Sequence, residues 1–169
     1  MTINRERLAA LAAEPHCHGG RYRNLEPVPR HGLGDFLRWQ LAPGRRFPQG
    51  KRYTLLRPDG HLLAKPPQKP QLVWLGHSSF LFQHQGLNVL TDPVLSDRAS
   101  PFQLIGPKRH TPPALTVADM PPIHLVLISH NHYDHLDEAT VRQLHRRFGT
   151  HLRFCIPMGL RPWFEKRGI

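Results

Sequence analysis

The segment 123–135 constrains this chain most, because an apolar run passes directly into a cluster of side chains that bind metal ions. Residues Ile123 to Ser129 predict a strand, in which Leu125-Val126-Leu127-Ile128 is buried on both faces, as strands of parallel sheets are. The sequence His130-Asn131-His132-Tyr133-Asp134-His135 follows it at once. Because active-site residues often lie on the loops that leave strand ends, we expect a sheet with a functional site at the end of this strand.

The spacing within residues 130–135 indicates how these side chains are used. His130 and His132 lie two residues apart, so in an extended backbone they point to the same side and can share one metal ion. Asp134 and His135, at the turn into the next helix, can bind a second ion at roughly 3.5–4 Å from the first. Imidazole and carboxylate ligands suit Zn²⁺, with iron or manganese as lesser alternatives. We therefore predict that all four residues are zinc ligands.

A solvated histidine-rich loop is the alternative interpretation, since the chain contains 13 histidines. A chance cluster, however, need not follow a fully apolar strand or precede a capped helix. Asp137 is a typical N-cap residue, and residues 138–147 have the pattern of a helix that ends at Gly149. The context on both sides of the motif therefore favours a metal site.

The remaining C-terminal part is predicted to consist of strands, turns and one further helix. Strands are expected at 72–75, 79–83, 87–91 and 151–156, and a short helix at 160–166. A proline-rich loop fills residues 96–122, and loops of such length are usually functional or disordered. The three tryptophans, Trp39, Trp74 and Trp163, are expected in the core.

Residues 1–70 form a different kind of segment, which is rich in proline and arginine. Residues 33–41 predict a short amphipathic helix, which either packs on the main domain or lies on a membrane surface. Residues 65–70 (Lys-Pro-Pro-Gln-Lys-Pro) are typical of a stiff connector. We therefore expect an N-terminal extension with its connector at 1–70, and the first part of the folded domain at 71–169.

The charge of the chain points to anionic partners. Lysine and arginine number 23 against 12 acidic residues, a formal net charge of +11. Such an excess favours phospholipid surfaces, nucleic acid or phosphate-bearing substrates, and a solvated basic surface is the simpler alternative. No apolar run reaches the roughly 20 residues that span a bilayer. Because residues 1–7 also lack the pattern of a signal peptide, a cytoplasmic location is expected.

Four stretches resemble one branch of the metallo-β-lactamase superfamily, whose hallmark is His-x-His-x-Asp-His. The flanking motifs are similar to those of the N-acylphosphatidylethanolamine-hydrolysing phospholipase D group and its bacterial relatives. They are Trp74-Leu75-Gly76-His77-Ser78-Ser79-Phe80, Leu90-Thr91-Asp92-Pro93-Val94, Gly106-Pro107-Lys108-Arg109 and residues 127–137. The resemblance implies an α+β fold, the αββα sandwich of this superfamily. The chain would cover the N-terminal half of that sandwich plus the extension.

The resemblance also implies how the motif residues divide between two zinc ions. His130 and His132 would bind one ion, and Asp134 and His135 the other. The family's further ligands are a third histidine, a bridging aspartate and a last histidine, all of which lie well downstream. The later histidines of this chain, His145 and His151, come too early to supply them.

Asp92 and His77 are further candidates near this site. In the family the Thr-Asp-Pro strand end lies near the metals, so Asp92 would orient a ligand histidine. The alternative is that Asp92 caps the turn before Pro93. His77 either faces the site or only forms hydrogen bonds within its own turn. Lys108 and Arg109 either meet a phosphate or form a solvated pair on a loop.

The resemblance predicts metal-assisted hydrolysis of a phosphodiester by a phospholipase D-like enzyme. Its substrates would be N-acylphosphatidylethanolamine-like lipids or other phosphate esters, and an anionic membrane surface would be a further partner, with the protein peripheral to that membrane. Two zinc ions would activate a shared water, and Asp134 would also steer the proton of the nucleophile.

Two alternatives to this function remain open. A nuclease or lactonase of the same fold is the first, and the +11 charge favours nucleic acid slightly, whereas the flanking motifs argue against it. A truncated, catalytically incomplete chain that binds metal weakly or not at all is the second. Half of a sandwich should in addition expose an apolar sheet face, and the oligomeric state stays open.

Overall fold

The computed structural model describes residues 5–6, 9, 13, 17–19, 21–22, 32–42, 54, 56–64 and 68–169 except 105. The chain divides into two compact units, Met1–Lys51 and Arg52–Ile169. We describe each unit by itself. The expected boundary near residue 70 stays a prediction, and residues 65–67 of the connector lie outside the described part.

Among the residues of the first unit that the structure describes are a short hairpin and the helix α2. Strands β1 (Cys17–His18) and β2 (Arg21–Tyr22) pair in antiparallel fashion. Helix α2 spans Leu33–Leu41, which confirms the predicted helix. It begins where the amide of Gly32 donates to the Asp35 carboxylate at 3.0 Å, an interaction that satisfies one of the free N–H groups at a helix start. None of the helices in the described residues is long and apolar enough to cross a bilayer.

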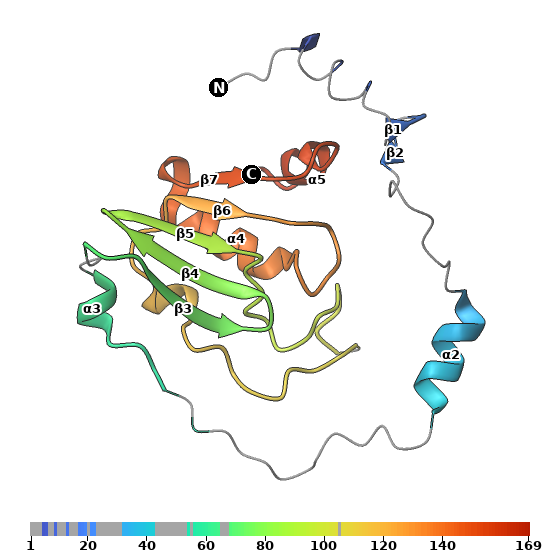
Figure 1. Ribbon diagram of the computed structural model, residues 1–169, viewed down its shortest axis with the longest axis horizontal. Coiled ribbons are helices and arrows are strands. Elements are labelled where there is room, and N and C mark those ends of the chain that lie inside the picture. Colours follow the sequence, from blue (N-terminus) through green and yellow to red (C-terminus); the bar gives the residue numbers. More distant parts are fainter. Residues whose placement is uncertain are drawn as a thin grey trace. The chain divides into compact units, whose positions relative to one another are not determined.

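The second unit is built on a mixed five-stranded sheet in which spatial order follows chain order (Figure 1). The strands β3 (Gln71–Gly76), β4 (Ser79–His84) and β5 (Leu87–Thr91) form an antiparallel meander. Strands β6 (Leu125–Leu127) and β7 (Arg153–Cys155) then add in parallel. All five strands were predicted. The last two strands are shorter than expected. Beyond their ends the pairing continues only as isolated backbone hydrogen bonds, such as that from Ile128 N to Cys155 O at 2.9 Å.

Helices and 3₁₀ turns connect these strands. Helix α4 (Glu138–Phe148) begins at its predicted N-cap Asp137 and stops at Gly149, whose φ of +56° suits glycine. Helix α5 spans Arg161–Glu165, and the 3₁₀ helices η1 and η2 span Val117–Asp119 and Gly149–His151. Helix α3 (Gly60–Ala64) was not predicted, because five residues are too few to show a helical period.

The core lies between one face of the sheet and α4. Residues of adjacent strands stand in register as a row, Val73, Leu81, Leu90 and Val126. They belong to the same apolar cluster as the α4 residues Val141 and Leu144 and the α3 residue Leu63, and α4 is drawn behind the sheet in Figure 1. This alternation of buried and outward residues is the period-two pattern of strands.

The opposite face of the sheet carries apolar residues as well, and it is open. Leu72 and Trp74 of β3 are 63% and 62% exposed, and Leu127 of β6 is 36% exposed. By register, Trp74 stands opposite Phe80, so aromatic and aliphatic side chains continue across this face. The expected open face is therefore present. The expectation that Trp74 lies in the core is wrong, since its strand turns it outward.

We expect substitutions on the two faces of the sheet to differ in their effect on the free energy of unfolding. Leu81→Ala, on the covered face, should lower the free energy of unfolding by about 2–5 kcal/mol. Leu72→Thr, on the open face, should change it by about 0.5 kcal/mol or less and should reduce the binding of an apolar fluorescent dye. Urea denaturation and dye titration measure the two effects. Equal destabilisation by both substitutions would contradict the assignment of the faces.

Candidate metal centre

Three separate segments meet at one edge of the sheet. The turn between β3 and β4 supplies His77, the end of β5 supplies Asp92, and the loop after β6 supplies residues 130–135. Strands β5 and β6 are parallel, so their carboxyl ends lie side by side. The sheet therefore brings together residues that are widely separated in the sequence.

His130 and His132 converge as their spacing predicted. Nε2 of His130 lies 3.1 Å from Nδ1 of His132, and the ring centroids are 4.6 Å apart. Ser129 Oγ donates its single proton to Asp92 at 2.6 Å, and it also lies 2.9 Å from His130 Nδ1. The hydroxyl therefore accepts a hydrogen bond from the Nδ1–H of His130, which in the neutral ring leaves a lone pair on Nε2.

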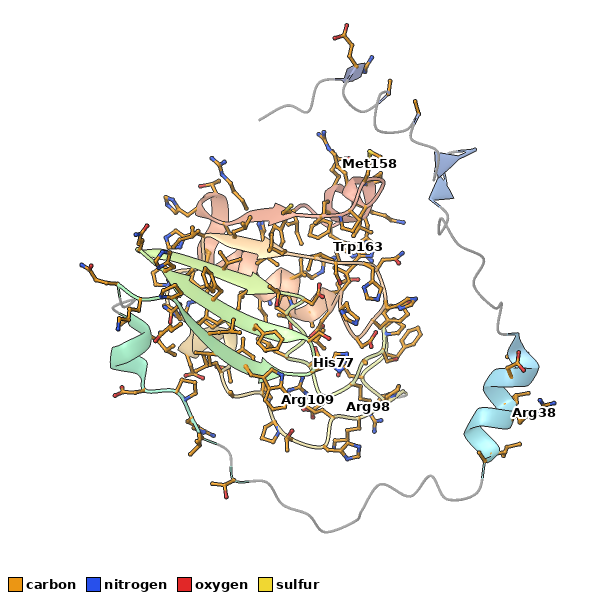
Figure 2. The ribbon with its side chains drawn as sticks, in the orientation of Figure 1. Arg38, His77, Arg98, Arg109, Met158 and Trp163 are labelled. Atoms are coloured by element: carbon orange, nitrogen blue, oxygen red, sulfur yellow. The ribbon has the colours of Figure 1, made fainter. Side chains whose placement is uncertain are left out.

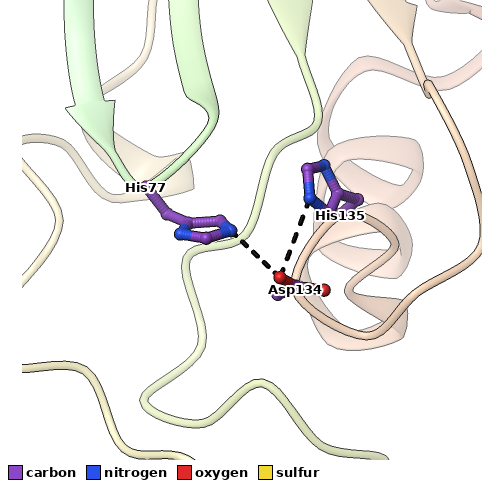
Figure 3. Close-up of side chains that lie close together, drawn as sticks. All are labelled: His77, Asp134 and His135. Atoms are coloured by element: carbon purple, nitrogen blue, oxygen red, sulfur yellow. Dashed lines mark hydrogen bonds and ion pairs between the residues drawn. The ribbon is translucent and has the colours of Figure 1, made fainter. Parts of the chain in front are cut away.

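Asp134 and His135 form the second pair. Asp134 Oδ2 lies 3.7 Å from His135 Nε2 and 3.1 Å from His77 Nε2. One ligand atom from each of these three residues lies within 4.8 Å of the others. Figure 3 shows His77 reaching from the β3–β4 turn toward the two residues that precede α4. His77 thus faces the site, rather than bonding only within its turn.

Asp92 connects the end of β5 to the histidine motif. Its carboxylate accepts the amide of Ser129 at 2.7 Å and the Ser129 hydroxyl at 2.6 Å, and it lies 2.9 Å from His135 Nδ1. Burial raises the pKa of Asp92, but the hydrogen bonds from Ser129 and His135 together outweigh it and leave the pKa below its ordinary value. The carboxylate holds the Nδ1 proton of His135 and so directs Nε2 outward.

The backbone at Asp92 is strained and is held by its neighbours. Its φ is +38°, a region that residues with a Cβ rarely adopt. The buried hydroxyl of Ser79 donates to Asp92 O at 2.6 Å and accepts from Val94 N at 2.9 Å. Asp92 N donates to Leu127 O at 2.8 Å. The role of Ser79 was not predicted, because nothing in the local sequence signals this contact.

Asp137 does more than cap α4. Its buried carboxylate accepts the amides of Ala139 and Thr140, as a cap does, and also the amide and hydroxyl of Ser96, both at 2.9 Å. It therefore fixes the segment after β5 to the start of α4, two residues after His135.

The arginines of the long loop are occupied by the backbone. Arg109 donates from Nε to Ser96 O at 3.0 Å and from Nη2 to Val94 O at 2.7 Å. Arg98 donates to Gly106 O at 2.6 Å, and Figure 2 shows both arginines in the same part of the domain as His77. A Cβ on Gly106 would lie 2.7 Å from Ser100 Cβ, so this close approach requires glycine. The loop is thus held in place, and Arg109 is a structural residue rather than a solvated one.

Comparison with known proteins agrees with this geometry. Residues 71–163 match the family model of the β-lactamase superfamily domain. The chain belongs to the metallo-β-lactamase superfamily. The predicted α+β fold is thereby confirmed, since the mixed sheet with few helices is the arrangement expected of this superfamily.

Several members of the superfamily are similar in sequence. N-acyl-phosphatidylethanolamine-hydrolyzing phospholipase D 1 of Caenorhabditis elegans is 38% identical over 96 residues, which are 57% of this chain and 27% of the nematode protein. An uncharacterized protein of Mycobacterium tuberculosis is 36% identical over 92% of this chain and 43% of its own length. A UPF0173 metal-dependent hydrolase of Pyrobaculum neutrophilum is 42% identical over 41% of this chain and 26% of its own length. The chain thus spans less than half of each relative.

The donor atoms of the metallo-β-lactamase motif fit a divalent cation. Ligands bound to one tetrahedral zinc ion at about 2.0–2.1 Å lie roughly 3.3 Å apart. The separations of 3.1 Å between the donors of His130 and His132 and of 3.7 Å between those of Asp134 and His135 are close to this value. His130 and His135 also point Nε2 away from the oxygens that hold Nδ1, as metal-binding histidines do. The four ligand roles stay predictions.

We expect Asp92→Asn to lower stability most at neutral pH. Because the pKa of Asp92 is lower in the folded chain than in the unfolded one, the ionised carboxylate stabilises the fold above the unfolded-state pKa of about 3.9, and this contribution is lost as the pH falls further, through the folded-state pKa. Asparagine tolerates the positive φ, so the backbone is kept while the charge and one acceptor oxygen are lost. The substitution should lower the free energy of unfolding by about 1–3 kcal/mol at pH 7 and by less at pH 3, as measured by urea denaturation.

Asp97→Asn is the matched control for this measurement, since Asp97 is exposed on the following loop. A loss for Asp92→Asn that is the same at both pH values would show that the charge of Asp92 does not contribute.

Proposed function

We propose that this chain supplies ligands of a zinc-dependent metallo-hydrolase site that cleaves phosphodiesters in the manner of a phospholipase D. The observation that carries the proposal is the convergence of two donor pairs at one sheet edge, each held from behind by an oxygen that orients its histidine. His130 and His132 would hold one zinc ion, and Asp134 and His135 the other. When bound, such a pair of cations lowers the pKa of a shared water and stabilises charge on the attacked group.

The residues themselves perform orientation and proton handling. Asp92 fixes the tautomer of His135, and Ser129 fixes that of His130. Asp134 is partly exposed and presents Oδ2 between His77 and His135. The other oxygen of its carboxylate, Oδ1, would then be left to accept the proton of a nucleophilic water. The site lies at an open sheet edge, so a large substrate can approach it.

Three features support a lipid phosphodiester at a membrane as the substrate. The similar nematode protein carries N-acyl-phosphatidylethanolamine hydrolysis in its name. The formal charge of +11 attracts anionic headgroups and membrane surfaces. In α2, Leu33, Leu37 and Leu41 are exposed and lie four residues apart on one side of the helix, as in helices that lie on membranes. The charge and the apolar side of α2 support our proposal that the protein acts at the surface of an anionic membrane, with the cytoplasm as its proposed location.

The proposal is tested by measuring whether the protein hydrolyses two phosphodiester substrates. Vesicles that contain N-acylphosphatidylethanolamine and a soluble phosphodiester such as bis(p-nitrophenyl) phosphate should be hydrolysed, and a chelator should abolish the rate. His132→Ala should lower the rate by at least about 100-fold, because the loss of a metal ligand costs more than the roughly 10–100-fold that the loss of an outer hydrogen-bond partner costs. The exposed histidine in η2 gives the control His151→Ala, which should be neutral.

Hydrolysis of single-stranded DNA or of a lactone, without hydrolysis of either phosphodiester, would favour the nuclease or the lactonase instead. A rate that His132→Ala leaves intact would exclude the metal site from the reaction.

A further inference from the structure

His77 occupies an unusual position in the turn between β3 and β4. Its φ is +47°, next to Gly76 at +117°, and a residue with a Cβ is disfavoured there. The indole Nε1 of Trp74 donates to His77 O at 2.8 Å and holds the turn in place. Strained backbone of this kind tends to occur at functional sites. The turn presents the imidazole of His77 to the residues that precede α4.

The hydrogen bond of His77 does not account for this strain. Within the described residues its imidazole has one hydrogen-bond partner, Asp134 Oδ2 at 3.1 Å. The side chains of His77 and Asp134 are 50% and 43% exposed. An exposed pair of this kind contributes little to stability, so it offsets little of the strain in the turn. A ligand shared with Asp134 gives His77 a reason to be held there.

We propose that His77, Asp134 and His135 together hold one divalent cation, so that the Asp134 pair gains a third protein ligand from the β3–β4 turn. This inference rests on the proposed metal-dependent function. The three donor atoms lie within 4.8 Å of one another, with Oδ2 of Asp134 at 3.1 Å from His77 Nε2 and 3.7 Å from His135 Nε2. A tetrahedral zinc ion needs about 3.3 Å between its ligands, so small side-chain rotations suffice.

The donor set also suits a catalytic site. Two imidazoles and one carboxylate around zinc leave a fourth position open for water or substrate. Two neutral histidines and one carboxylate leave a net positive charge on a divalent cation, which favours an anionic substrate. His135 is already oriented by Asp92, and His77 is held by its turn. The three ligands come from residues 77–135, so this cation does not depend on His130 or His132.

The test is Co²⁺ binding to the 169-residue chain, followed by its visible absorption, with Zn²⁺ competition as confirmation. The chain should bind one Co²⁺ in this site. His77→Asn should weaken binding by more than the roughly 10–100-fold that loss of an outer hydrogen-bond partner costs. Asparagine tolerates the positive φ and can still donate to Asp134, so the turn should fold, which circular dichroism checks. The control His151→Ala should leave affinity unchanged.

A double variant, His130→Ala with His132→Ala, separates the inference from the proposed function. Binding that survives in the double variant and fails in His77→Asn supports the three-residue site. Binding that fails in the double variant and survives in His77→Asn overturns the inference, while a metal site at the motif still stands. If the wild-type chain binds no cation, the inference is wrong. The hydrolysis assay then decides the proposed function separately.

Discussion

The carboxylate of Asp92 is the interaction on which the rest of the candidate site depends. It lies almost buried at the end of β5, where it accepts both hydrogen-bonding groups of Ser129 and the Nδ1 proton of His135. A buried charge is costly unless its oxygens are satisfied, and here three donors satisfy them. One carboxylate thereby ties β5 to the loop after β6 and sets the direction of a histidine ring. The Ser129 hydroxyl relays the same constraint to His130.

Much of this arrangement follows from local sequence pattern. The short apolar runs and the turn between residues 72 and 91 located three strands, and the apolar run before His130 located a fourth. The two-residue spacing of His130 and His132 was enough to bring their nitrogens together, because side-chain direction in extended backbone has a period of two. The N-cap at Asp137 could also be predicted from the sequence, since few residue types can accept hydrogen bonds from the free amides at a helix start.

Contacts that depend on tertiary structure could not be predicted from local sequence pattern. The contact between His77 and Asp134 joins two separate turns. The positive φ of His77 could not be predicted from the sequence, because residues with a Cβ rarely adopt it. The bridge made by Ser79 and the backbone contacts of Arg109 likewise arise only once the strands are paired. Trp74 was misplaced because an aromatic residue in a strand is assigned to the core by composition, whereas its register assigns it to the open face.

The order of the strands in the sheet has a consequence for how the site is assembled. The pairs β3–β4 and β4–β5 close over short turns, whereas β5–β6 and β6–β7 need long crossovers. Because local closure costs less chain entropy than distant closure, we expect the meander to form before the parallel strands join it. His77 and Asp92 stand on one side of that division and His135 stands on the other, so the contacts that orient His135 form late. A cation site that needs His77 and His135 together is then a marker of completed folding.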